Sequence, residues 1–411
     1  MAEFLHLSTF LRRPIVDQDG ERLGRVQDLV ARLGDDSHPP IVGAVVRIEG
    51  RDVFVPVRKI GGWSSGRMTF EGKRVDLRRF ERRPGEILLA QDLLSRNLIN
   101  LVRGRLMVAH EIEIAEMNGR WEVVGVGPGR RSFFGGTSRS GGVVDFGSIL
   151  PFVSHVPSAR LRIPYRKLAK LHPAQIADLV EQASHEEGEE IIEAVGLDRE
   201  LEADVFEELD TEHQLEFLEA RSDSEAARLL SRMEPDNAAD LITEIDQERR
   251  LNVLENLPSE QQSKVRQLLS YNADTAGGLM NTDFVTAPRD ASVGDVLDIV
   301  RSSSVPAESL YAVFLLGEGE EPVATVALGA LVKSRDSERA LDLARTPFSH
   351  VHPQWDVHRV ASTMSDYNLL LVPVLDDDHG RLLGVITVDD LLEELLPQGW
   401  RREFGMTSVE E

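Results

Sequence analysis

The sequence predicts a multidomain α+β protein with a β-rich N-terminal region, an α-helical centre and an α/β C-terminal region. Short apolar runs separated by turn residues dominate the first 165 residues. Apolar residues recur with helical spacing over residues 166–275, and residues 276–397 alternate strand and helix patterns twice. These changes of pattern place domain boundaries near residues 165 and 275, and residues 398–411 are predicted to form a polar tail.

Two similar β-rich segments are predicted in the N-terminal region, at about residues 1–80 and 85–165. In the first segment, the tight-turn pair Asp19-Gly20 precedes LGRV, and residues 41–48 are almost continuously apolar. In the second segment, Asn118-Gly119 is the predicted turn of a hairpin. The order strand, DGERLGRV, strand, strand and VPV resembles the PRC-barrel, a small β-barrel associated with protein contacts.

Short helices separated by capping residues are predicted throughout residues 166–275. The apolar bursts recur about every two dozen residues, which is typical of a small α-helical superhelix. From LHPAQIADLVE through MEPDNAADLITEI to LPSEQQSKVRQLLSY, this segment resembles the N domain of MgtE-type magnesium channels.

Residues 276–397 contain two strand–helix units, at about 276–340 and 341–397. The second unit carries LVPV followed by GVITVDD, which resembles the signature of a CBS module, so the region is expected to be a CBS pair. Between the helical centre and this pair lies LLSYNADTAGGLMNTDFV, which resembles the junction of MgtE-type channels. We expect its adjacent glycines, Gly277 and Gly278, to adopt backbone conformations that side chains forbid and to form a sharp hinge.

Charge is unevenly distributed along a chain whose net charge is −24. Residues 166–275 hold 28 acidic and 11 basic residues, so the helical centre is a concentrated anionic body. Such a surface repels nucleic acid and attracts cations or basic partners. Arginines do gather near residue 80, but glutamates lie among them and no recognition-helix pattern or aromatic array is present. We therefore expect no nucleic-acid binding, and interpret these arginines as a solvated face or a dock for the acidic segment: Arg78, Arg79, Arg82 and Arg83.

The sequence predicts a cytoplasmic protein without a transmembrane segment. No run approaches the roughly 18–20 apolar residues that cross a bilayer, and the N-terminus lacks the pattern of a signal peptide. The absence of cysteine excludes disulfides, thiolate metal sites and cysteine nucleophiles. Neither HExxH nor GxSxG occurs, so we expect no enzyme.

The resemblance to MgtE implies Mg²⁺ sites between the helical centre and the CBS pair. Mg²⁺ prefers hard oxygen ligands and can be held by one or two carboxylates from facing surfaces. Where the family has an acidic–aromatic pair after the tyrosine of the second CBS module, this chain has Asn368-Leu369, which weakens one bridging site. For each aspartate alone, a solvated acidic face is the simpler interpretation. The positions that match the family's metal-binding positions are Asp204, Asp236, Asp240, Gly278 and Asp390.

The CBS resemblance also implies a site for an adenine nucleotide such as ATP. By resemblance, Gly384 would allow close approach, Thr387 would contact phosphate and Asp390 would accept from ribose hydroxyls. The alternative is that Thr387 caps a helix, with Asp390 in its first turn. The first CBS unit has lost these polar groups, so at most one nucleotide site is expected; alanines occupy the three equivalent positions: Ala324, Ala327 and Ala330.

Two functions remain open from the sequence. The favoured hypothesis is a magnesium-responsive regulatory or sensor protein, in which Mg²⁺ (and ATP as a second candidate) controls packing of the acidic helices on the CBS pair. The resemblance further implies a homodimer through the CBS pair and an unidentified protein partner, with a membrane transporter as one candidate. The alternative is a constitutive interaction scaffold with vestigial ligand sites.

Overall fold

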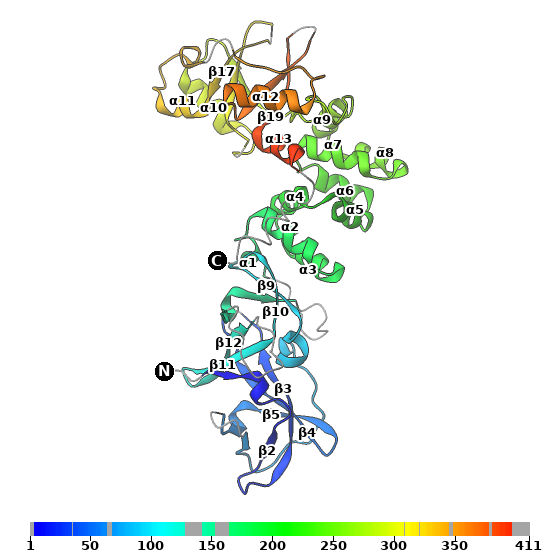
Figure 1. Ribbon diagram of the computed structural model, residues 1–411, viewed down its shortest axis with the longest axis vertical. Coiled ribbons are helices and arrows are strands. Elements are labelled where there is room, and N and C mark those ends of the chain that lie inside the picture. The colour runs from blue at the N-terminus through cyan, green and yellow to red at the C-terminus, as the bar shows by residue number, and fades with distance from the viewer. Residues whose placement is uncertain are drawn as a thin grey trace. The chain divides into compact units, whose positions relative to one another are not determined.

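The computed structural model describes residues 4–34, 36–63, 68–127, 142–152, 164–307, 309–319, 321–344, 348–377 and 380–396. The chain divides into two compact units, Met1–His213 and Gln214–Glu411 (Figure 1). Helices and strands are mixed as predicted, which confirms the multidomain α+β fold. The division falls inside the helical centre, so the boundaries near residues 165 and 275 stay predictions. The predicted tail, residues 398–411, lies outside the described residues.

The first unit begins with a region of short strands. They are β1 (Phe4–His6), β2 (Pro14–Val16), β3 (Arg22–Arg32), β4 (Ile41–Ile48), β5 (Arg51–Pro56), β6 (Ile60–Gly61), β7 (Thr69–Phe70), β8 (Glu86–Leu88), β9 (Asn97–Asn100), β10 (Arg105–Val108), β11 (Glu111–Met117), β12 (Arg120–Gly127), β13 (Val144–Asp145) and β14 (Ile149–Pro151). The largest sheet has the order β5-β4-β3-β2-β7-β6 with β8 beside β3; the others have the orders β1-β11-β12-β13 and β10-β9-β14.

Both predicted turns are confirmed. Gly20, between β2 and β3, has a φ of 83°. Asn118 and Gly119 join β11 to β12 with φ values of 53° and 77°, which are the positive values that a two-residue hairpin turn requires.

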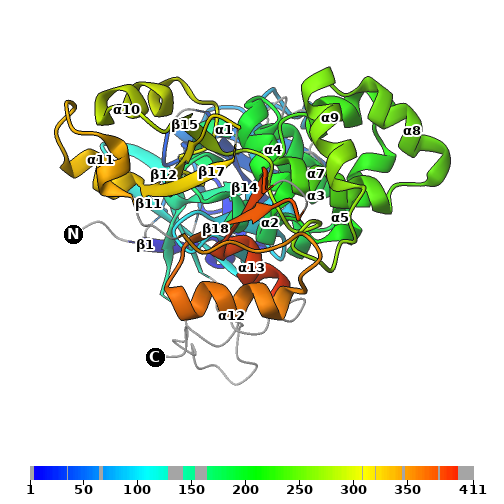
Figure 2. The ribbon, with the colours of Figure 1, turned by 90° about the horizontal axis from the view of Figure 1, so that it is seen from above.

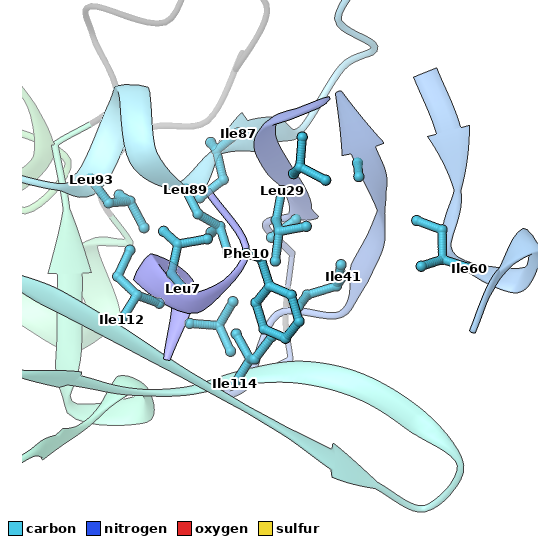
Figure 3. Packing of buried hydrophobic residues seen from close by; sticks show 14 of the residues in the cluster. Leu7, Phe10, Leu29, Ile41, Ile60, Ile87, Leu89, Leu93, Ile112 and Ile114 are labelled. Atoms are coloured by element: carbon cyan, nitrogen blue, oxygen red, sulfur yellow. The ribbon is translucent and has the colours of Figure 1, made fainter. Parts of the chain in front are cut away.

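The two β-rich segments exchange their first strands. β1 pairs with β11 of the second segment, and β8 pairs with β3 of the first, both antiparallel. Phe10 and Leu29 consequently share a core with Leu89 and Ile112 (Figure 3). The two predicted copies are therefore interlocked in one folded body, and their assignment to the PRC-barrel stays a prediction.

Ion pairs account for three of the four arginines near residue 80. The guanidinium groups pair with carboxylates of the same β-rich region at 2.6–3.8 Å: Arg78 with Asp76, Arg82 with Asp92, and Arg83 with Glu86. Their charge is thus largely matched locally.

Helices α1 (Tyr165–Leu168), α2 (Pro173–Gln182), α3 (His185–Val195) and α4 (Arg199–Glu207) complete the first unit, and α5 (Thr211–Glu219) crosses the division. The β-rich region contacts these helices directly. Asn97 donates to Glu187 of α3 at 3.0 Å. A Cβ at Gly104, whose φ is 59°, would lie 2.7 Å from the Gln175 side chain of α2. The first helices are therefore anchored to the β-rich region.

In the second unit the helical segment continues with α6 (Asp223–Leu230), α7 (Pro235–Glu244), α8 (Gln247–Asn256) and α9 (Ser259–Leu268). Arg249 of α8 donates to the Asp223 carboxylate and to the Arg221 carbonyl, each at 2.8 Å. This side chain ties α8 to the start of α6 and supplies a donor to the carbonyls that follow α5.

Two repeats follow, and their strands pair in the same way. The first contains β15 (Val285–Pro288), α10 (Val293–Ser302), β16 (Ala312–Leu316), β17 (Pro322–Ala327) and α11 (Leu328–Lys333). The second contains α12 (Val357–Tyr367), β18 (Leu371–Leu375), β19 (Leu382–Thr387) and α13 (Val388–Leu395). β15 is parallel to β16, as the bridge from Val351 to Val374 is parallel in the second repeat. β16–β17 and β18–β19 are antiparallel.

The junction glycines serve close contact rather than an unusual backbone conformation. Neither Gly277 nor Gly278 has a positive φ, so that part of the prediction is wrong. A Cβ on Gly277 would lie 2.5 Å from the Tyr271 ring, and one on Gly278 would lie 2.4 Å from the Asn272 carbonyl oxygen. Side chains here would prevent the turn from closing.

The buried carboxyl of Asp28 in β3 should make the stability of the β-rich region depend on pH. Its buried carboxylate accepts from the backbone N–H groups of Ala90 and Gln91 at 2.8 and 2.9 Å, and burial raises its pKa to about 6. Because the folded state then binds this proton more tightly than the unfolded state, the carboxyl's contribution to stability falls as pH rises from about 4 to about 6. The change amounts to up to about 3 kcal/mol.

We expect Asp28→Asn to lose this part of the pH dependence. Denaturant unfolding followed by tryptophan fluorescence at pH 4, 5, 6 and 7 measures it, because Trp63 and Trp121 stack in this region with centroids 4.9 Å apart. The same slope in both proteins would contradict the assignment.

Candidate metal site

Helix α7 brings two carboxylates to its first turn. Glu234 is the N-cap, Pro235 occupies the first helical position, and Asp236 follows. Proline suits this position because its fixed φ matches the helix and it has no N–H to satisfy. The positive end of the helix dipole favours acidic residues here.

Helix α13 brings a third carboxylate to the same place. Thr387 caps the helix in a capping box: its hydroxyl donates to Asp390 Oδ2 at 2.5 Å and accepts from the Asp390 N–H at 3.3 Å. The first turns of α7 and α13 meet (Figure 1), and one carboxylate oxygen from each of Glu234, Asp236 and Asp390 lies within 4.8 Å of the others.

The three carboxylates are withdrawn from water and repel one another. Burial raises the pKa of Asp236 well above its usual value, and the charges of Asp390 and Glu234 raise it further. Burial, followed by the charge of Asp390, raises the pKa of Glu234 to about 7. Burial also raises the pKa of Asp390. Ionising all three carboxyl groups in the folded protein is therefore costly unless a cation is present.

One buried oxygen in this cluster lacks a hydrogen-bond partner. Asp236 is 7% exposed, and its Oδ1 has no donor among the described residues. A buried carboxylate oxygen without a partner is rare and needs an explanation, such as an ion. Three hard oxygen ligands from two facing helices fit the preferences of Mg²⁺. The residues present could therefore hold this ion.

The remaining predicted metal positions are dispersed. Asp240 lies one turn further along α7; the surrounding protein raises its pKa to about 6, and Glu394 and Glu244 add repulsion. Gly278 lies in the junction turn, where its N–H donates to the Thr275 carbonyl at 2.9 Å. Asp204 is exposed on α4 in the first unit. The structure thus brings Asp236 and Asp390 together and does not add the other three to their cluster.

Glu234 is a member of the cluster that the sequence reasoning missed. Its position before Pro235 marks it as an N-cap, and an acidic residue two positions before Asp236 could have been included on that ground. What the sequence does not show is its contacts: Glu234 accepts from Asn281 Nδ2 at 2.8 Å and from the Ser309 hydroxyl at 3.1 Å.

The predicted nucleotide residues are engaged within the chain. A Cβ on Gly384 would lie 2.7 Å from the Asn281 carbonyl oxygen, so this glycine admits the chain's own junction. Thr387 and Asp390 form the capping box, which is the alternative that the sequence left open. In the first repeat, Ala327 is the N-cap of α11 and offers no side-chain cap.

Asn368 has a backbone role. It ends α12 in the left-handed conformation with a φ of 51°. Asparagine tolerates this conformation better than most residues with a side chain. The position at which this chain has asparagine in place of the expected acidic residue is therefore the C-cap of α12.

A second acidic group has a structural explanation. Glu181, Asp210 and His213 have ligand atoms within 4.8 Å of one another. Asp210 accepts from the His213 N–H at 2.9 Å and contacts its ring at 2.7 Å, and its own N–H donates to Glu181 at 2.8 Å. These hydrogen bonds organise the start of α5.

Comparison with known proteins identifies the domains. Residues 171–274 match the MgtE intracellular N domain, and residues 340–397 match the CBS domain. The chain thus carries an MgtE N domain and a CBS domain, and its helical region and CBS pair have homologues among MgtE magnesium transporters. Among the described residues, no helix is long and apolar enough to span a bilayer.

The relatives are magnesium transporters MgtE. The protein of Enterococcus faecalis is 32% identical over 153 residues, which cover 37% of this chain and 33% of the relative. That of Bacillus subtilis is 29% identical, covering 47% and 43%. This chain therefore spans about a third to two fifths of their length.

The solved structures that resemble the chain include two from magnesium transport proteins. The soluble part of a magnesium transporter has a TM-score of 0.52 at 28% identity, covering 56% of this chain and 90% of that one. The cytosolic domain of the Mg²⁺ channel MgtE in complex with ATP has a TM-score of 0.52 at 25% identity, covering 56% and 93%.

Removing the charge of Asp236 should stabilise the metal-free protein. In EDTA at pH 8 we expect Asp236→Asn to raise the melting temperature of the second unit by a few degrees, equivalent to about 1–3 kcal/mol, because a buried anionic oxygen without a partner is lost. Differential scanning calorimetry measures the change.

Asp389→Asn is the matched control, since it removes one charge from an exposed position in the first turn of α13, next to Asp390. An equal rise in both variants would show that net charge, rather than the buried oxygen, sets the effect.

Proposed function

We propose that this chain is a magnesium-responsive regulatory protein, in which Mg²⁺ bound by Glu234, Asp236 and Asp390 controls packing of the acidic helices on the CBS pair. The observation that carries the proposal is the buried Asp236 Oδ1, which has no hydrogen-bond partner among the described residues and belongs to a cluster with two further carboxylates. The homology to MgtE magnesium transporters supports the choice of cation.

The physical basis is the removal of repulsion. Without a cation, docking α7 on α13 brings like charges together in a poorly solvated place. A divalent ion held there favours the docked arrangement by the difference between its affinities for the docked and undocked states. Asp240 and Asp204 are further proposed Mg²⁺ ligands, and the Gly278 backbone is another, although none belongs to this cluster.

We propose that the protein is cytoplasmic and that a partner protein recognises its docked or undocked state. The curated relatives are transporters, and a membrane transporter is the candidate partner. The β-rich region, which is anchored to α2 and α3, is the proposed contact surface.

An adenine nucleotide is the proposed second ligand. One of the similar structures is a complex with ATP. Gly384, Thr387 and Asp390 would hold the nucleotide at the start of α13, where the helix N-terminus favours phosphate. Asp390 would then connect the nucleotide to the metal cluster.

A constitutive scaffold is the second candidate function. Two observations favour it. In the first repeat Ala327 replaces the capping threonine, and in the second repeat Asn368 is explained by its role as the C-cap of α12. A scaffold would keep the same compactness at every Mg²⁺ concentration.

Small-angle scattering distinguishes these functions. With Mg²⁺ titrated from zero to about 10 mM at an ionic strength of about 0.15 M, where surface charges are screened beyond about 8 Å, we expect saturable compaction. Na⁺ holds the ionic strength constant.

The compaction should be lost in Asp236→Ala/Asp240→Ala and kept in Asp389→Asn. A radius of gyration that does not respond to Mg²⁺ in the unmodified protein would reject the sensor in favour of the scaffold.

We further propose a homodimer through the CBS pair. Large apolar side chains are exposed on three of its helices and in the turn after α12: Val332 (68% exposed), Tyr367 (61%), Leu370 (57%), Leu392 (50%) and Leu395 (37%). Val332 and Leu392 occupy equivalent positions in α11 and α13, two residues after the Ala330 and Asp390 positions. α12 and α13 lie beside each other (Figure 2). This internal repetition suits a two-fold contact with a second copy, since the same patch must serve both partners.

Val332→Glu/Leu392→Glu should convert the dimer to a monomer, because two charges would be buried in each copy. Light scattering after gel filtration gives the mass. Leu251→Glu, at a 64% exposed position of α8, is the control. A monomeric unmodified protein, or a dimer unaffected by the double substitution, would contradict this interface.

A further inference from the structure

Asn281 links the junction to β19 and to the start of α7. It is a buried polar residue, 3% exposed, in the junction between α9 and the CBS pair. Its N–H donates to the Val385 carbonyl of β19 at 2.8 Å, and its carbonyl accepts from the Val385 N–H at 2.9 Å. The junction is thereby fixed to the last strand of the second repeat.

The Asn281 side chain extends this attachment to α7. Its Nδ2 donates to Glu234 Oε2 at 2.8 Å, and its Oδ1 accepts from the Asp283 N–H at 2.8 Å. The Ser309 hydroxyl, from the first repeat, donates to the other oxygen of Glu234 at 3.1 Å. The start of α7 is thus bonded by neutral donors to the junction and to the first repeat.

An ion pair attaches the same junction to α9. Lys264 Nζ lies 2.7 Å from Asp283 Oδ1 and 3.1 Å from Glu260 Oε1, and its side chain is 26% exposed. Gln267, one turn later in α9, donates to the Leu383 carbonyl of β19 at 3.3 Å. None of these contacts requires a metal ion.

We propose that Asn281, with the Lys264–Asp283 pair, forms a metal-independent clamp that holds α7 and α9 on the CBS pair and sets the Mg²⁺ concentration at which docking is complete. The threshold part of this inference rests on the proposed function; the clamp itself does not. The clamp opposes the repulsion among Glu234, Asp236 and Asp390, so it shifts the docking equilibrium before any ion binds.

The consequence is quantitative. The apparent affinity for a ligand is proportional to the fraction of protein already in the binding-competent state, so it falls when that fraction falls. Each lost contact should therefore raise the Mg²⁺ midpoint by about three- to tenfold, because a typical intramolecular hydrogen bond makes a net contribution of that order.

The absence of cysteine allows a direct distance measurement. Asn252→Cys on α8 and Asp298→Cys on α10 introduce two exposed labelling sites on the helical segment and the first repeat. Fluorescence energy transfer between dyes at these sites reports separation of the helices from the CBS pair in the full chain.

In EDTA we expect Lys264→Met and Asn281→Ala to increase the mean dye separation or broaden its distribution, and in titrations with MgCl₂ to raise the midpoint three- to tenfold. Lys264→Met retains the apolar stem at a partly exposed position, so it tests the clamp even where Asn281→Ala fails to fold. Lys333→Met on α11 makes the same charge change at an exposed position and should behave as the unmodified protein.

Distances in EDTA that match those of Lys333→Met in both clamp variants would overturn the clamp. Unchanged Mg²⁺ midpoints beside altered EDTA distances would overturn its control of the threshold. A failure of the proposed function is separate from both, because it would show as no Mg²⁺ response in the unmodified labelled protein.

Discussion

The repulsion among three carboxylates at two facing helix starts is the constraint on which the second unit depends. Glu234, Asp236 and Asp390 are held together by the fold in spite of their charge, and Asp236 keeps a buried oxygen to which no group in the described part of the chain donates. Helix dipoles favour acidic residues at these positions, but they contribute only about 0.3–1 kcal/mol each when exposed. The remaining cost must be met by the surrounding contacts and, in the proposed function, by a cation.

The surrounding contacts explain why the junction has its composition. Gly277 and Gly278 allow the chain to turn tightly against Tyr271 and Asn272, and Gly384 admits the Asn281 carbonyl at β19. Asn281 then supplies a neutral donor to Glu234. The segment that joins the helices to the CBS pair therefore also forms one wall of the candidate metal site.

Much of this arrangement could be predicted from the sequence. Apolar periodicity and turn pairs indicated the strand-rich, helical and α/β regions, because local spacing determines which face each element buries. Asp236 and Asp390 followed from the resemblance to MgtE. Glu234 and Asn281 did not, because their contact joins residues 47 positions apart and depends on the tertiary fold. The exchange of β1 and β8 was missed for the same reason: the pattern shows that a strand exists and does not show its partner.

Anomalous diffraction from crystals grown with Mn²⁺ in place of Mg²⁺ tests the central claim most directly. We predict an anomalous peak that places a Mn²⁺ ion within bonding distance of Asp236 Oδ1 and the Asp390 carboxylate, because Mn²⁺ accepts the same oxygen ligands. Peaks only at exposed surface carboxylates, with Asp236 still without a partner, would contradict it.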